Sequence, residues 1–168
     1  MSAGGFGTTG STPSSAVLEQ KLRAEQIVKN GASWFLAIAG LSILNSVLTL
    51  SGTNFHFIFG LGITAIVDAV GRQSGTTGSA LSLVVNLFIA GVFLLFWNFA
   101  RRGERWAFLV GMALYAVDGV ILVPFKDFLG VAFHAYALFR IYNGMQGLPV
   151  LEEIRRRMMP ENTPIEPR

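Results

Sequence analysis

Between Ala32 and Ala100 the chain carries only two formal charges, Asp68 and Arg72. A water-soluble domain needs charged side chains over its whole surface, and roughly 25% of its residues are charged. Here charged residues make up 14% of the 168 residues, whereas 52% are hydrophobic. Uncharged apolar stretches of about 20 residues are what a helix needs to cross the hydrocarbon core of a bilayer. The sequence therefore predicts an all-α integral membrane protein.

Apolar segments of suitable length for transmembrane helices occur at about residues 32–51, 79–100, 106–123 and 128–147. A further apolar segment, residues 55–71, is short, rich in glycine and interrupted by Asp68. It is followed by residues 72–78, whose Gly, Ser and Thr content predicts a loop.

Three further segments flank the membrane domain, which is predicted over residues 30–148. Residues 1–16 have the composition of a flexible leader. Apolar residues recur at helical spacing over 17–29, which predicts an amphipathic helix lying on the membrane surface. Residues 149–168 predict a basic cytoplasmic tail that begins with a short helix.

The distribution of basic residues predicts how often the chain crosses the membrane, because cytoplasmic loops carry an excess of Lys and Arg. Thirteen residues are basic, and Arg140 lies inside a predicted span. If 55–71 crossed, the others would divide 5 against 7 between the two sides; if 55–71 begins and ends on one side, they divide 10 against 2. The sequence therefore predicts four crossings of the cell membrane, both termini cytoplasmic, and 55–71 as a re-entrant or interfacial helix on the outer side.

Each predicted span places a polar side chain at a similar depth, about 8–11 Å below the outer surface at 1.5 Å per residue. These side chains are Asn45, Asn86, Asp118 and His134. Asp118 and His134 are each eight residues from Lys126, at the centre of the turn between the last two spans. Positions equidistant from the turn of an antiparallel hairpin are level, so the imidazole can donate a hydrogen bond to the carboxylate.

Three interpretations of these polar residues compete. They form hydrogen bonds that hold the helices together, they line a polar ligand pocket on the outer side, or they bind a metal ion. The candidate ligand-binding residues are Asn45, Asn86, Tyr115, Asp118, His134 and Arg140. The candidate metal ligands are His56, Asp68, Asp118 and His134, which are suitable by type but match no known ligand spacing. Arg140 either extends to the headgroups or contacts an anion or a partner subunit.

Several functional classes are excluded by the sequence. Without cysteine the chain has no disulfide, thiolate nucleophile or iron–sulfur cluster, and the GxSxG, HExxH and P-loop signatures are missing. No cofactor is required by the sequence. Because the basic residues lie beside apolar segments, they indicate membrane orientation and not nucleic-acid binding.

The sequence thus favours a non-catalytic membrane component, which is a scaffold, an accessory subunit or a homo-oligomer. Its partners would be the lipid bilayer and either other membrane subunits or further copies of the chain. One alternative is a membrane-embedded enzyme in which His134 is the base and Asp118 orients it. The other is an oligomeric transporter or channel.

Overall fold

The computed structural model describes residues 15–50, 62–73 and 75–158, and these residues form an all-α bundle. Its helices are α1 (Ser15–Leu50), α2 (Gly62–Gln73), α3 (Gly75–Ala100), α4 (Arg105–Ile121), α5 (Phe128–Met145) and α6 (Gly147–Met158). The predicted leader over 1–16 lies almost entirely outside the described residues, as does the end of the predicted tail.

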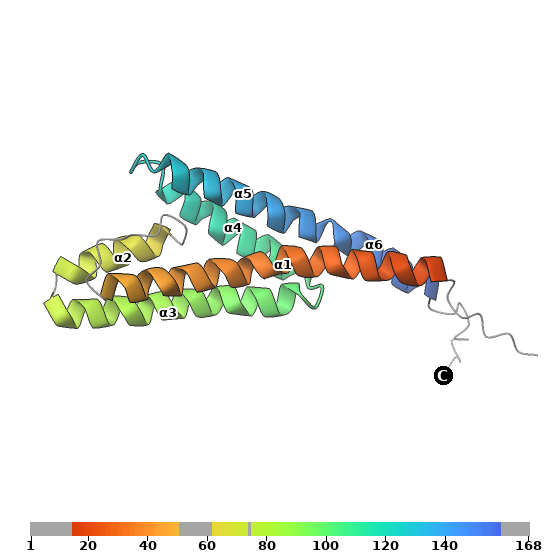
Figure 1. Ribbon diagram of the computed structural model, residues 1–168, viewed down its shortest axis with the longest axis horizontal. Helices are drawn as coiled ribbons and strands as arrows, with labels where there is room; N and C mark the ends of the chain where they lie inside the picture. The colour runs from red at the N-terminus through yellow and green to blue at the C-terminus, as the bar shows by residue number, and fades with distance from the viewer. Residues whose placement is uncertain (1–14, 51–61, 74, 159–168) are drawn as a thin grey trace, which may run out of the picture.

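The helices are arranged as two antiparallel pairs (Figure 1). The long helices α1 and α3 lie side by side, and α4 and α5 form a hairpin that packs against them. The short helix α2 lies at the end of the bundle where α1 ends and α3 begins. At the opposite end α6 continues from α5 and runs along the N-terminal part of α1.

Aromatic side chains fill the core where α1, α3 and α4 meet. The Phe35 ring lies 6.0–6.3 Å, between centroids, from the rings of Phe93, Phe96 and Phe108. Phe35 and Phe108 are completely buried. Glycine makes room for these rings, because a Cβ atom at Gly111 would lie 2.6 Å from the Phe35 ring.

Two residues of the connecting turn, Lys126 and Asp127, explain why α4 and α5 form a hairpin. Asp127 precedes α5, and its side chain accepts a hydrogen bond from the Gly130 amide at 2.9 Å, which caps the helix. Lys126 adopts φ 57°, a left-handed conformation suited to a tight reversal. The predicted hairpin is confirmed, and its helices end within two residues of the predicted limits.

The structure corrects the prediction of a separate interfacial helix over 17–29. These residues continue without a break into the predicted first span, and together they form the 36-residue helix α1. Gly31 lies within this helix and packs closely against Gly144 of α5. The Ser33 hydroxyl donates a hydrogen bond to the Asn30 carbonyl within the helix. Residues 17–29 therefore continue α1 and pack against α6.

The predicted loop over 72–78 is also wrong, because α2 runs to Gln73 and α3 begins at Gly75. A Cβ atom on Gly71 would lie 2.7 Å from the Gly78 carbonyl oxygen and 2.9 Å from Ser82 Cβ, so α2 and α3 pack closely. This packing overrides the weak helix propensity of Gly, Ser and Thr. Of the predicted segment 55–71, residues 62–71 belong to α2 and the rest lie outside the described residues.

Two of the described helices are long and apolar enough to cross a lipid bilayer. They are the segments Ser15–Leu48 within α1 and Ala80–Ala100 within α3. Helix α2 has 12 residues, and at 1.5 Å per residue it measures about 18 Å, less than a bilayer core of about 30 Å.

Candidate functional site

The predicted pairing of Asp118 with His134 is present in the structure. Nε2 of His134 lies 2.8 Å from Oδ2 of Asp118, across the α4–α5 hairpin. Both residues are buried, with 5% of Asp118 and 2% of His134 exposed. The hairpin thus brings a carboxylate and an imidazole together in the interior of the bundle.

The same carboxylate binds the N-terminus of α2. Oδ2 of Asp118 accepts a hydrogen bond from the Gly62 amide at 2.7 Å, and Oδ1 accepts one from the Ile63 amide at 2.8 Å. The first amides of a helix have no partner within the helix and carry its positive dipole. The first turn of α2 contains no acidic residue. Asp118 therefore supplies, from another helix, the anion that this helix start needs.

Both ring nitrogens of His134 have hydrogen-bond partners. Nδ1 lies 2.8 Å from the Gly130 carbonyl oxygen, which can only accept, so Nδ1 carries hydrogen. Nε2 faces the Asp118 oxygen that also accepts from the Gly62 amide. The imidazole therefore connects α5 to α4 at the point where α2 begins.

Tyr115 and Gly119 hold the imidazole from its two sides. The Tyr115 ring stacks on the His134 ring with centroids 4.2 Å apart and an interplanar angle of 17°. A Cβ atom on Gly119 would lie 3.0 Å from His134 Cβ and 3.1 Å from Cγ. The Tyr115 hydroxyl is buried and has no hydrogen-bond partner among the described residues. The imidazole consequently has little freedom to move.

A cleft of about 260 Å³ between α3 and α4 reaches Asp118 from the side of the bundle. Apart from Asp118, its lining side chains are all apolar: Ile63, Ile89, Val92, Phe93, Leu114, Val117 and Ile121. His134 does not line it. A lining of this kind suits hydrocarbon better than a polar substrate.

The two candidate asparagines lie on the α1–α3 side of the bundle. Asn86 of α3 is buried and donates a hydrogen bond from Nδ2 to Oγ of Ser46 on α1, at 2.9 Å. Asn45 is half-buried on α1. The structure therefore shows a hydrogen bond between α1 and α3 in addition to the Asp118–His134 pair between α4 and α5.

Arg140 lies on the outside of α5. It is exposed, and its guanidinium carbon lies 6.0 Å from the centre of the Trp34 ring, a cation–π contact between α5 and α1. It does not contribute to the Asp118–His134 cluster.

The two remaining candidate metal ligands are not described in the structure. His56 lies outside the described residues, and Asp68 belongs to α2 but its side chain is not described. Among the side chains that are described, no group of three or more His, Asp or Glu residues is placed to hold a metal ion. The proposed metal site thus has only Asp118 and His134 in place.

Comparisons with protein families, with curated proteins and with solved structures found no match to this chain. Two parts of the site were missed by sequence reasoning, the α2 amides and Gly119. No local signal marks Gly62 as a helix start, because its capping anion is 56 residues away in sequence. Gly119 is adjacent to Asp118 in sequence, and a small residue at that position is the signal that could have indicated a close contact between α4 and α5.

Proposed function

We propose that the chain is a membrane protein that crosses the bilayer four times, through α1, α3, α4 and α5, and acts as a non-catalytic component of the membrane. Large apolar side chains cover the outside of these helices, where a soluble bundle has polar ones. The most exposed are Phe88, Val120, Leu81 and Phe128, with 65–77% of their surface accessible. Contact with lipid accounts for helices that are apolar on their outer as well as their inner faces.

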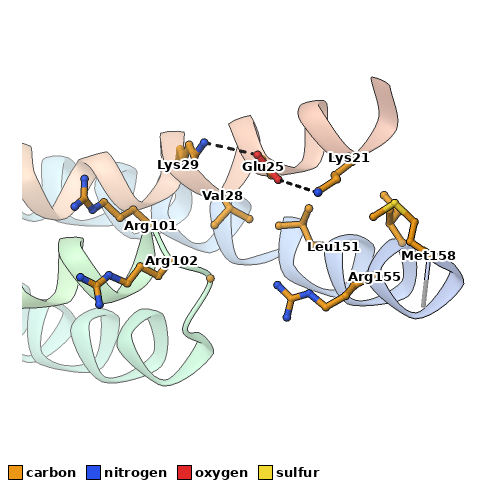
Figure 2. Close-up of a pocket in the computed structure, with 11 residues that line it drawn as sticks. Lys21, Glu25, Val28, Lys29, Arg101, Arg102, Leu151, Arg155 and Met158 are labelled. Atoms are coloured by element: carbon orange, nitrogen blue, oxygen red, sulfur yellow. Dashed lines mark ion pairs between the residues drawn. The ribbon is translucent and has the colours of Figure 1, made fainter. Parts of the chain in front are cut away.

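The positions of the basic residues support a topology in which α2 does not cross. Lys21 and Lys29 of α1, Arg101 and Arg102 of the α3–α4 turn, and Arg155 of α6 all line one cavity (Figure 2). If these segments share one end of the molecule, that end is cytoplasmic by the positive-inside rule. Both termini would then be cytoplasmic, and α2 would lie on the outer side.

The observation that carries the non-catalytic proposal is that Asp118 and His134 already form hydrogen bonds with each other, with the start of α2 and with the backbone of α5. Both carboxylate oxygens of Asp118 and both ring nitrogens of His134 make hydrogen bonds of 2.7–2.8 Å within the bundle. A general base needs a free lone pair within reach of its substrate. We infer that the cluster holds α2 against the α4–α5 hairpin and shapes the outer face of the protein.

The test replaces Asp118 with Asn, which keeps the shape but places an amide donor either against the Ile63 amide or against the Gly62 amide and His134 Nε2. A buried donor without an acceptor costs about 1–3 kcal/mol, so we expect the Asp118→Asn protein to melt several degrees lower in detergent. We also expect faster hydrogen exchange at the Gly62 and Ile63 amides. Glu104→Gln, an exposed carboxylate whose side chain caps no helix, is the matched control and should change neither measurement.

A His134→Gln variant and the double variant complete a double-mutant cycle. Because the two side chains bond directly, their effects on stability should not add, with a coupling of about 0.5–3 kcal/mol. If instead both single variants melted like the wild type and their amides stayed protected, the cluster would not be structural, and an enzymatic role for Asp118 and His134 would gain support.

A further inference from the structure

A basic cavity of about 230 Å³ lies where the N-terminal part of α1, the α3–α4 turn and α6 meet (Figure 2). Five basic residues and one acidic residue, Glu25, line it. The basic residues are Lys21, Lys29, Arg101, Arg102 and Arg155. Like charges repel, so their gathering in one concave site is unfavourable unless an anion compensates them.

The single carboxylate in the cavity is shared between two ammonium groups. Oxygens of Glu25 lie 3.9 Å from Nζ of Lys21 and 3.7 Å from Nζ of Lys29. Among the described residues, Arg155 has no ion-pair partner, whereas Arg156 and Arg157 beside it both pair with Glu153. The Arg157 bond also lowers the pKa of Glu153. Among the residues that the structure describes, one carboxylate therefore faces five basic side chains in this cavity.

The basic side chains differ in how they are placed. Lys21 of α1 points toward α6, and Arg155 of α6 points toward the α3–α4 turn, while Arg101 and Arg102 extend away from both (Figure 2). Arg101 lies over the Trp97 ring at 4.5 Å and Arg102 over the Phe99 ring at 5.8 Å. Lys21 and Arg155 are not held over a ring in this way, so they are the side chains that we assign to direct contact with an anion, and the two arginines of the turn add positive potential at the rim.

Apolar side chains line the cavity beside these charges. Val28 of α1 and Ile154 of α6 are buried, with 2% and 3% exposed, and Leu151 and Met158 lie next to them. An inorganic anion would gain no binding free energy from these apolar side chains. A phosphate ester that carries a hydrocarbon portion matches both halves of the lining.

We propose that this cavity binds the phosphate of an anionic phospholipid of the cytoplasmic leaflet. The inference rests on the proposed membrane topology, which places the cavity at the inner headgroup level. Trp97, beneath Arg101, is typical of that level. A soluble phosphate ester carries the same phosphate group and is the other ligand that could occupy this cavity.

The experiment titrates the purified full-length protein in detergent with dioctanoyl phosphatidic acid and counts bound lipid by native mass spectrometry. The test variant is Lys21→Gln/Arg155→Gln. The control, Arg23→Gln/Arg156→Gln, removes the same charge from the same two helices, but its residues do not line the cavity. Removing two basic contacts should weaken binding roughly 30-fold, whereas the control should change it less than about threefold.

Two further titrations on the unmutated protein identify the ligand without depending on any variant. Dioctanoyl phosphatidylcholine should bind at least tenfold more weakly than phosphatidic acid. Glycerol 3-phosphate, used as a competitor, should displace the lipid only at much higher concentration. Displacement at equal concentration would assign the cavity to a soluble phosphate ester and overturn the lipid assignment.

Equal weakening in the test and control variants would overturn the proposal, because it would show that binding follows overall charge and not this cavity. Equal binding of phosphatidylcholine and phosphatidic acid would overturn it as well. Neither result bears on whether the helices cross the bilayer, which is measured separately by cysteine labelling.

Discussion

Asp118 shows how one side chain can connect three helices. It lies on α4, accepts hydrogen bonds from the first amides of α2, and pairs with His134 of α5. A buried carboxyl group is costly unless it is hydrogen-bonded. Hydrogen bonds to an imidazole and to a helix N-terminus explain why this group is tolerated inside the bundle.

Gly119 gives a residue-scale test of how tightly the imidazole is held. A Cβ at this position would meet His134 Cβ at 3.0 Å, so Gly119→Ala must displace the ring from Asp118 or separate α4 from α5. We expect a loss of about 1–3 kcal/mol in the free energy of unfolding, measured by thermal or denaturant unfolding in detergent.

Gly91 of α3 provides the matched control, because a Cβ there would meet nothing within 4 Å. Gly91→Ala should be neutral or stabilise the protein by up to about 1 kcal/mol, through helix propensity alone. Equal changes in the free energy of unfolding for Gly119→Ala and Gly91→Ala would show that the close contact between Gly119 and His134 does not affect stability.

At the scale of the helices, α1 and α5 approach through a pair of glycines. A Cβ on Gly31 would collide with the backbone of Gly144, and a Cβ on Gly144 would collide with the backbone of Gly31. Small residues allow this close approach, and close approach strengthens the van der Waals contact on which membrane helices depend. The contact lies beside Ile141, which is also completely buried.

Gly31→Ala is therefore expected to force α1 and α5 apart, because only backbone atoms face the new methyl group and they cannot rotate away. The expected cost is about 1–3 kcal/mol in the free energy of unfolding. Gly40→Ala, on the same helix with nothing within 4 Å, should leave stability unchanged or raise it slightly. The idea fails if both variants unfold at the wild-type temperature.

Periodicity and hairpin symmetry were enough to predict the α4–α5 hairpin and the Asp118–His134 bond, since both depend on neighbouring segments. The continuity of α1 was missed because residues 17–29 and the first span were predicted as separate helices from a change in polarity. The helical state of 72–78 was missed because Gly, Ser and Thr favour a loop where packing between α2 and α3 favours a helix. The capping of α2 by Asp118 could not be predicted, because no pattern links a helix start to an anion 55 or 56 residues away.

Over the whole molecule, side chains are sorted by position along the bundle. Apolar residues cover the outside of α1, α3, α4 and α5, whereas five of the basic residues of α1, α6 and the α3–α4 turn line one cavity. In the proposed topology this arrangement favours one orientation in a membrane with a negative inner surface. The end of the bundle that carries the basic cavity should therefore face the cytoplasm, and the end that carries α2 should face the outside.

The absence of cysteine makes this topology directly testable, because any single cysteine introduced is the only thiol in the chain. Gln73→Cys in α2 and Phe125→Cys in the α4–α5 turn should react with a membrane-impermeant maleimide in intact cells. Gln20→Cys, Glu104→Cys and Glu152→Cys should react only after permeabilisation. All five positions are exposed in the folded chain, so their reactivity reports the compartment and not burial.

Labelling of a Phe88→Cys variant distinguishes the proposed membrane protein from a water-soluble bundle. Phe88 lies in α3 with 72% of its surface accessible, so a thiol there would react readily in water. In the proposed topology lipid covers it, and it should stay unlabelled before and after permeabilisation and react only in denaturant. Labelling of this position in native conditions would contradict the membrane proposal, and labelling of Gln20 and Glu104 from opposite sides would show that α2 belongs to a fifth crossing.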